Sequence, residues 1–148
     1  MSNKNNVWAR RKARRALLQA VYQWQLSGNE LASIRQDFQQ GDALKKADLE
    51  FFDELLGKVV RQTSDLDEAY TGLLDRDAEQ LDHVERAILR LATAEFRFRI
   101  DIPYRVVINE YVELAKSFGA TDSYKYINGV LDQLATQLRT VEVEAARG

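Results

Sequence analysis

Cysteine is absent from the 148-residue sequence, proline occurs once and glycine only seven times. Without cysteine, the chain can form no disulfide bond, thiolate metal site or catalytic thiol. With so little proline and glycine, it favours long helices joined by short loops. No apolar run approaches the roughly 20 residues that a membrane-spanning helix needs. We therefore expect a cytoplasmic protein without a membrane segment.

Common catalytic motifs are also missing. Gly57-Lys58-Val59 lacks the preceding glycine and the Ser or Thr of a phosphate-binding loop. His83 is the only histidine, and no cysteine is present to complete a zinc site with it. No pair of carboxylates stands in an apolar setting that would raise the pKa of one of them for acid–base catalysis. The sequence therefore predicts no enzyme activity, no cofactor and no metal.

Charge is distributed unevenly along the chain. The net charge is −2, yet residues 1–15 contain no acidic residue and six basic ones, Lys4, Arg10, Arg11, Lys12, Arg14 and Arg15. A basic arm on an acidic body is typical of proteins that bind polyanions. Two other interpretations remain: an ordinary solvated face, or an Arg-rich transit peptide. The second is disfavoured because the segment continues into a helix with an apolar face.

Apolar residues at helical spacing predict six or seven helices, and no alternation typical of strands persists. In the first half we expect a helix over residues 9–26, a second helix that is capped by Asn29 and runs to about residue 39, a helix capped by Asp48, and a short helix that Ser64 begins. The helix after Asp48 is predicted to turn inward Leu49, Phe52, Leu55, Leu56, Val59 and Val60.

Start and stop signals are clearer in the second half. Asp82 and Glu85 have the spacing of a capping box, Pro103 suits a helix start, and Gly119 suits a helix end. Thr121 is predicted to cap the last helix, and the tail after about residue 140 is expected to fray. The predicted fold class is all-α, with about seven helices in two packed bundles over residues 1–77 and 78–148.

The arginine-rich run suits phosphate. Residues 10 and 14 are four apart, as are residues 11 and 15, so each pair projects along one strip of the helix. Planar guanidinium groups make bidentate, charge-assisted hydrogen bonds to phosphate. Such contacts give affinity with little choice of sequence, and the run alone is a weak predictor.

A second candidate lies over residues 116–132, where a helix end, a tight turn and a helix start follow one another. Free N–H groups at the helix start can donate hydrogen bonds to a phosphate, and the rings of Tyr124 and Tyr126 can stack on unpaired bases. Hydrogen-bonding side chains stand among them: Asp122, Ser123, Lys125 and Asn128. In the alternative interpretation, Tyr126 packs between helices, Asn128 braces the turn and Gly129 permits close helix contact.

Several segments together are similar to one known family. They are residues 10–15 and 19–27 near the start, residues 84–90, residues 102–110 and 113–120, and the long block 122–132. The sequence resembles, over nearly its whole length, the NusB family of bacterial transcription antitermination factors. The block 122–132 is specific, whereas the arginine run is not. Tyr126 stands where many relatives have Phe, and Tyr111 replaces a small residue.

The resemblance implies an all-α protein that binds the boxA element of nascent RNA together with NusE, a ribosomal protein of the small subunit. The pair would help RNA polymerase to read through terminators in ribosomal RNA operons, as part of an antitermination complex. Tyr22, Glu79 and Glu85 would contact NusE, unless they are ordinary surface and Glu85 only completes its capping box. The RNA face would comprise Arg10, Arg11, Lys12, Arg14, Arg15, Phe118, Asp122, Ser123, Lys125, Tyr126 and Asn128.

Two alternatives stay open. The acidic body, with Glu79 and Glu85, also suits a protein–protein scaffold for which RNA contact is incidental. A NusB-like domain of the kind fused to RNA cytosine methyltransferases is disfavoured, because 148 residues leave no cofactor-binding domain. In the leading interpretation, the basic start and the turn around residues 122–128 share one RNA-binding surface, with the ring of Tyr126 accessible.

Overall fold

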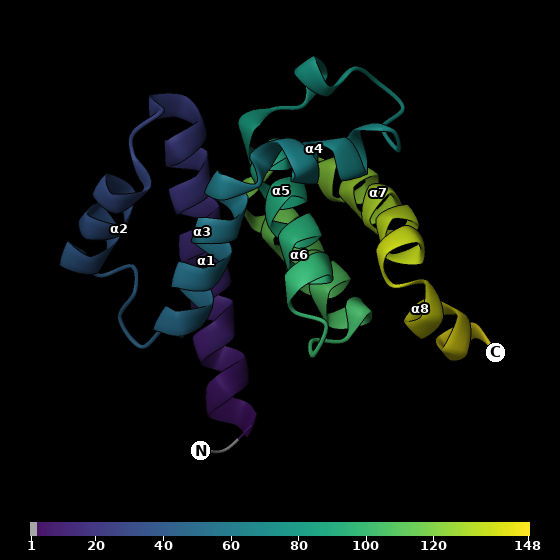
Figure 1. Ribbon diagram of the computed structural model, residues 1–148, viewed down its shortest axis with the longest axis horizontal. Helices are drawn as coiled ribbons and strands as arrows, with labels where there is room; N and C mark the ends of the chain where they lie inside the picture. The colour runs from purple at the N-terminus through teal and green to yellow at the C-terminus, as the bar shows by residue number, and fades with distance from the viewer. Residues whose placement is uncertain (1–2) are drawn as a thin grey trace. The chain divides into compact units, whose positions relative to one another are not determined.

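The computed structural model describes residues 3–148, with side chains from residue 6 onward, so Lys4 of the basic arm lies outside the described side chains. Eight α-helices and one short 3-10 helix make up the described elements, without a strand among them, which confirms the all-α prediction (Figure 1). Packing divides the chain into two compact units, Met1–Arg61 and Gln62–Gly148. The division after residue 77 stays a prediction. Across residues 3–148, no helix combines the length and apolar character needed to cross a membrane.

The first unit contains α1 (Asn3–Ser27), α2 (Leu31–Gln40) and α3 (Leu49–Arg61), and each of these helices contacts the other two (Figure 1). The apolar stripe predicted for α1 is confirmed, because Ala13, Ala16, Leu17, Ala20 and Val21 are all buried. The N-cap of α2 is Glu30 and not Asn29 as predicted. Helix α1 ends at Ser27, and the next residue, Gly28, has a φ of 68°, in the left-handed region that glycine adopts without strain. These features fix α1 as the central helix of the unit.

Asp48 fixes the start of α3 against α1. Its Oδ1 accepts a hydrogen bond from the Phe51 amide at 3.1 Å, and its own amide donates to the carbonyl of Ala9 at 3.0 Å. This docking sets the rotation of α3, so Phe51 is buried while Leu49 is 54% exposed. The predicted cap is confirmed, but the prediction that Leu49 faces inward is wrong.

The second unit contains α4 (Thr63–Thr71), the 3-10 helix η1 (Ala78–Gln80), α5 (His83–Phe98), α6 (Tyr104–Phe118), α7 (Ser123–Leu138) and α8 (Thr140–Arg147). Helices α5, α6 and α7 contact one another, and α4 packs on α5 and α7 (Figure 1). Tyr111 is fully buried in this core, where its hydroxyl donates to Glu95 Oε1 at 2.7 Å. At the position of α6 where a small residue was expected from the resemblance, the core therefore contains a hydrogen-bonded tyrosine.

The helix starts of this unit follow the predictions in part. In the capping box, the Glu85 amide donates to Asp82 Oδ1 at 2.7 Å and the Asp82 amide donates to Glu85 Oε1 at 3.1 Å, as predicted. Helix α7, however, has Asp122 and not Thr121 at its N-cap, with a left-handed φ of 66°. The tight turn after Gly119 moves the helix start by one residue.

The tail does not fray, so that prediction is wrong. Arg139 is 6% exposed, and its guanidinium donates to the carbonyl oxygens of Phe96, Arg99 and Ile102. It also pairs with Glu142 Oε1 at 2.6 Å, while Glu142 Oε2 accepts from the Tyr104 amide at 2.8 Å. Val143 is buried as well. Helix α8 is therefore held in place by groups at the ends of α5 and α6.

Candidate nucleic-acid interface

The basic residues of α1 divide into an inner and an outer strip. Arg14 is only 3% exposed and Arg10 is half-buried, whereas Arg11, Lys12 and Arg15 are exposed. The four-residue spacing predicted two strips, and the structure shows that only one of them is fully accessible.

The inner strip packs on α3. The guanidinium carbon of Arg14 lies 5.1 Å from the ring centroid of Phe51, and that of Arg10 lies 5.7 Å from the same ring. Arg10 Nε is also 3.7 Å from Asp48 Oδ2. Both arginines therefore hold α1 against the start of α3 through cation–π contact with a buried ring.

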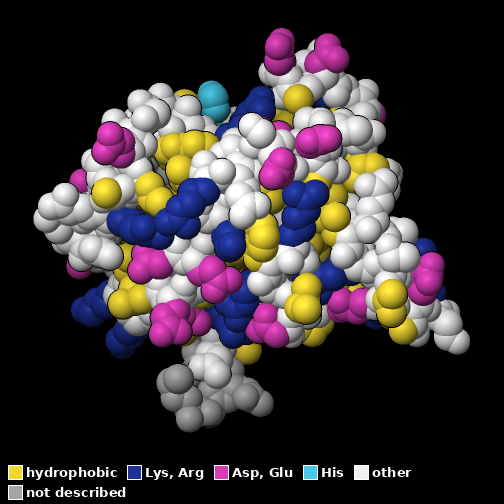
Figure 2. Space-filling view, viewed as in Figure 1, with side chains coloured by type: hydrophobic (Ala, Val, Ile, Leu, Met, Phe, Trp, Pro, Cys, Tyr) yellow, Lys and Arg dark blue, Asp and Glu magenta, His cyan; other side chains and the backbone are white. Residues whose placement is uncertain are grey.

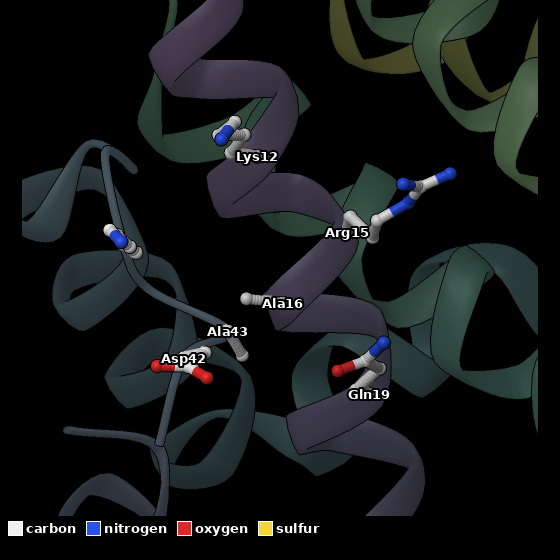
Figure 3. A pocket seen from close by; sticks show the side chains of 7 residues that line it. Lys12, Arg15, Ala16, Gln19, Asp42 and Ala43 are labelled. Carbon is white, nitrogen blue, oxygen red and sulfur yellow. The ribbon is translucent and has the colours of Figure 1, made fainter. Parts of the chain in front are cut away.

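Lys12 and Arg15 of the outer strip border a hollow of about 270 Å³ within the first unit (Figure 3). Its lining comes from α1 and from the loop that precedes α3, and comprises Lys12, Arg15, Ala16, Gln19, Asp42, Ala43 and Lys45. Three of these side chains are cations and one is an anion. On the face of this unit shown in Figure 2, basic and acidic side chains are mixed. Cations therefore outnumber anions among the side chains that line the hollow, although the guanidinium of Arg15 points away from the loop with Asp42 and Ala43 in Figure 3.

Lys45 is a candidate that the sequence reasoning missed. It lies 30 residues after Arg15, in a loop where Lys45-Lys46 is the only signal. The loop Gly41–Asp48 brings it to the same hollow as Lys12 and Arg15. Only the packing of this loop on α1 reveals the association.

The turn between α6 and α7 exposes a second set of predicted residues. Phe118, the last residue of α6, is 42% exposed. Asp122, Lys125 and Asn128 are exposed along the first turns of α7, and Lys125 Nζ lies 3.3 Å from Asp122 Oδ1. These four side chains are open to a ligand in this unit.

Ser123 and Glu85 are buried, at 7% exposure each. Ser123 Oγ donates to Glu85 Oε2 at 2.9 Å, while Glu85 Oε1 completes the capping box of α5. Both groups therefore join the start of α7 to the start of α5, and their polar atoms are engaged within the protein.

Tyr126 is half-buried and lies beneath an arginine. The guanidinium carbon of Arg76 is 4.0 Å from its ring centroid. Burial, followed by the negative charge of Asp75, raises the pKa of Tyr126. Tyr124 is also half-buried, with Lys116 Nζ 5.1 Å from its ring centroid. Gly129 has no heavy atom within 4 Å of the place where a Cβ would be, so the close helix contact considered for it is absent.

The residues predicted to contact a protein partner differ in exposure. Tyr22 of α1 is 38% exposed, and Glu79 of η1 is exposed. Glu85 is the buried member of the set. Tyr22 in the first unit and Glu79 in the second are therefore the side chains of this set that are open to a partner.

Comparison with known proteins gives one consistent answer. The model of the NusB family matches residues 11–136. A transcription antitermination protein NusB from Alcanivorax borkumensis is 53% identical over 147 residues, which are 99% of this chain and 98% of that protein. The corresponding protein from Pseudoalteromonas translucida is 52% identical over 131 residues, 88% of this chain and 96% of its own.

A solved structure shares the fold. That structure, T. maritima NusB, superposes with a TM-score of 0.76 at 29% identity, over 86% of this chain and 90% of its own. Sequence and structure therefore agree along most of the chain. The protein belongs to the NusB family.

Proposed function

We propose that this protein is a transcription antitermination factor that binds boxA-type single-stranded RNA together with the ribosomal protein NusE. In this role it acts within an antitermination complex of RNA polymerase and promotes read-through in ribosomal RNA operons. The name shared by its relatives, transcription antitermination protein, supports the general activity. The observation that carries the RNA-binding part is the cationic hollow beside α1.

The cationic hollow suits the phosphates of a flexible strand. Arg11, Lys12 and Arg15 are exposed on one helix, and Lys45 approaches from the loop. Guanidinium and ammonium groups bind phosphate oxygens by charge-assisted hydrogen bonds and release condensed counterions. For the half-buried Arg10 and the buried Arg14 we propose an indirect part, in which they hold α1 in place.

The start of α7 is the proposed base-contacting surface. Phe118 offers an exposed ring and Tyr126 a half-buried ring beneath Arg76, and Lys125 and Asn128 offer hydrogen-bond donors on the first turns of α7. Asp122 sets the turn and lies beside Lys125. Ser123 contributes by fixing the helix start through its hydrogen bond to Glu85. Each of the two surfaces lies within one unit, and in the proposal both act on the same RNA strand.

For the NusE contact we propose Tyr22 and Glu79 as the exposed groups. A partly exposed tyrosine is a frequent anchor in protein interfaces, and an acidic side chain suits a basic ribosomal protein. For Glu85 we propose an indirect part in the NusE contact, because its capping box positions the start of α5. Its carboxylate is already bound to Ser123 and Asp82.

Fluorescence anisotropy tests this proposal. A labelled boxA-type oligonucleotide and a scrambled one of equal length are titrated with the protein, with and without NusE. We expect tighter binding to the boxA-type strand and a further gain when NusE is added. Equal, weak binding to both strands in both conditions would refute the proposal.

A protein–protein scaffold is the second candidate, favoured by the exposure of Tyr22 and Glu79. Replacing Arg11, Lys12 and Arg15 by Gln separates the two functions, because all three are exposed and none is part of the core. The scaffold is supported if this variant still recovers NusE and retains full antitermination activity. Loss of antitermination with NusE binding retained supports the RNA-binding function.

A further inference from the structure

Arg76 and Tyr126 form a two-layer stack in the second unit. The guanidinium carbon lies 4.0 Å from the ring centroid, which is the separation of a cation in van der Waals contact with a ring face. Arg76 comes from the loop between α4 and η1, whereas Tyr126 comes from α7. Neither the loop nor its arginine belongs to the residues that the resemblance assigns to RNA.

Asp75 fixes the guanidinium in this position. Arg76 Nε donates to Asp75 Oδ1 at 2.9 Å. The hydroxyl of Tyr126, at the edge of the ring, is a buried atom near Asp75, so this edge of the ring is covered by the protein. The guanidinium of Arg76 is therefore already held over the ring of Tyr126. It loses little conformational entropy when a further planar group stacks on it.

The stack remains open to solvent. The side chain of Arg76 is 37% exposed, and that of Asp75 is 70% exposed. Because the guanidinium covers the ring of Tyr126, a base that approaches from that side meets Arg76 first. Unpaired bases stack on guanidinium planes as well as on aromatic rings.

The charges around Arg76 favour a base over a phosphate. Asp75, Asp77 and Glu79 are exposed acids within three residues of it, so the segment 75–79 carries a net charge of −2. This field opposes a phosphate group but does not repel a neutral nucleobase. The arginine therefore differs from those of α1, which lie in a segment without acids.

We propose that Arg76 is a base-contacting residue, whose guanidinium, stacked on Tyr126, receives one unpaired nucleobase of single-stranded RNA. The inference rests on the proposed RNA-binding function and deepens it. Tyr126 is then the rigid support of the stack. The terminal nitrogens of the guanidinium lie in its plane and can donate to the edge of a neighbouring base.

The test uses the full chain and the boxA-type oligonucleotide, with 2-aminopurine placed at single positions. The fluorescence of 2-aminopurine reports changes in how the base at its position is stacked, so the fluorescence of one position should change on binding to the wild type. Arg76→Lys keeps the positive charge and loses the planar guanidinium group. We expect about tenfold weaker binding, an unchanged salt slope and loss of the fluorescence change at that position.

Arg105→Lys is the matched control. Arg105 is also an exposed arginine near a tyrosine, 5.7 Å from the ring centroid of Tyr104, at the end of α6 opposite Phe118. Its replacement should leave both the affinity and the fluorescence change on binding as they are in the wild type. Circular dichroism of both variants should match the wild type, because both side chains are on the surface.

Three results would overturn the inference while leaving RNA binding itself intact. Arg76→Lys could bind the boxA-type strand as tightly as the wild type does. Arg76→Ala could bind more tightly, which would make Arg76 a cover over the ring of Tyr126. Arg76→Ala could instead flatten the salt slope by about 0.7, the value for one phosphate contact. If the wild type itself fails to distinguish boxA-type from scrambled RNA, the proposed function fails first.

Discussion

At the scale of single residues, Arg11 and Arg14 show how position on one helix separates two roles of the same side chain. Arg11 is exposed, whereas Arg14 is 3% exposed over the ring of Phe51. We predict that Arg11→Ala flattens the salt slope of RNA binding by about 0.7, since one phosphate contact is lost. Arg14→Ala should instead lower the free energy of unfolding by about 1–2 kcal/mol, through lost cation–π contact and packing.

Anisotropy titrations at several salt concentrations measure the first effect, and urea denaturation measures the second. The two variants serve as controls for each other. If Arg14→Ala changed the salt slope and Arg11→Ala changed stability, the assignment of inner and outer strips would be reversed.

Tyr70 gives the second unit a dependence on alkaline pH. It is fully buried and donates its hydroxyl to Asp67 Oδ1 at 2.7 Å. Burial, and then this hydrogen bond, raise the pKa of Tyr70 above its ordinary value of 10.0. The protonated form is therefore favoured in the folded state, so its contribution to stability is complete below pH 10 and is lost as pH rises further.

We predict that Tyr70→Phe removes this contribution. The unfolding free energy of the variant should fall less steeply above about pH 10 than that of the wild type, by up to about 1.4 kcal/mol per pH unit. At neutral pH the variant should be less stable by about 1 kcal/mol, because one buried hydrogen bond is lost. Denaturant titrations across this range test the prediction, and parallel profiles would contradict it.

At the scale of elements, the starts of α5 and α7 depend on each other. Ser123 Oγ binds the same carboxylate, Glu85, that completes the box with Asp82. We predict that Ser123→Ala lowers the free energy of unfolding by about 1–3 kcal/mol, because a buried carboxylate oxygen loses its donor. Asp82→Ala should cost about 1 kcal/mol, as loss of an N-cap does.

Thr121→Ala is the control for this pair. Thr121 was predicted to be the cap of α7, but it is exposed and lies one residue before the N-cap. Its replacement should change stability by less than about 0.5 kcal/mol in the same urea denaturation experiment. A loss as large as that of Asp82→Ala would show that Thr121 contributes to the helix start after all.

Helix positions could be predicted from the sequence because local signals determine them. Apolar spacing, the Asp82–Glu85 box and Pro103 placed α5 and α6 within a few residues. The rotation of α3 and the order of α8 could not be predicted, since both depend on distant contacts. Phe51 is buried in place of Leu49 because the amide of Asp48 binds the carbonyl of Ala9. Helix α8 is held by carbonyl groups that lie about 40 residues earlier in the chain.

The candidate site shows the same division. Periodicity separated the arginines of α1 into two strips, but only the packing of α3 shows that the strip with Arg14 faces inward. The pattern around the α6–α7 turn identified the exposed Lys125 and Asn128. Lys45 and Arg76 were missed, because loops without a recognisable motif bring Lys45 to the hollow of the first unit and Arg76 over Tyr126 in the second.

At the scale of the whole molecule, a protein with net charge −2 is proposed to bind a polyanion. This is physically consistent because screening limits repulsion from the acidic body to short range, while direct contacts remain.

If four phosphates are engaged, log K should fall with log salt at a slope of roughly −3. Replacing Arg11, Lys12 and Arg15 together by Gln should reduce the steepness by about 2. Anisotropy between about 50 and 200 mM salt measures both, and an unchanged slope would contradict the phosphate contacts.

The Arg139 cluster has a consequence for how the chain folds as it is made. Parts made early fold first on the ribosome, and the carbonyl groups of Phe96 and Arg99 are made about 40 residues before the guanidinium that binds them. Until residues 139–143 have left the exit tunnel, the nascent second unit has no partner for these carbonyls and no Glu142 to accept from the Tyr104 amide. Its final closure therefore has to wait until residue 143 has been made, whereas the residues of the first unit are all available by residue 61.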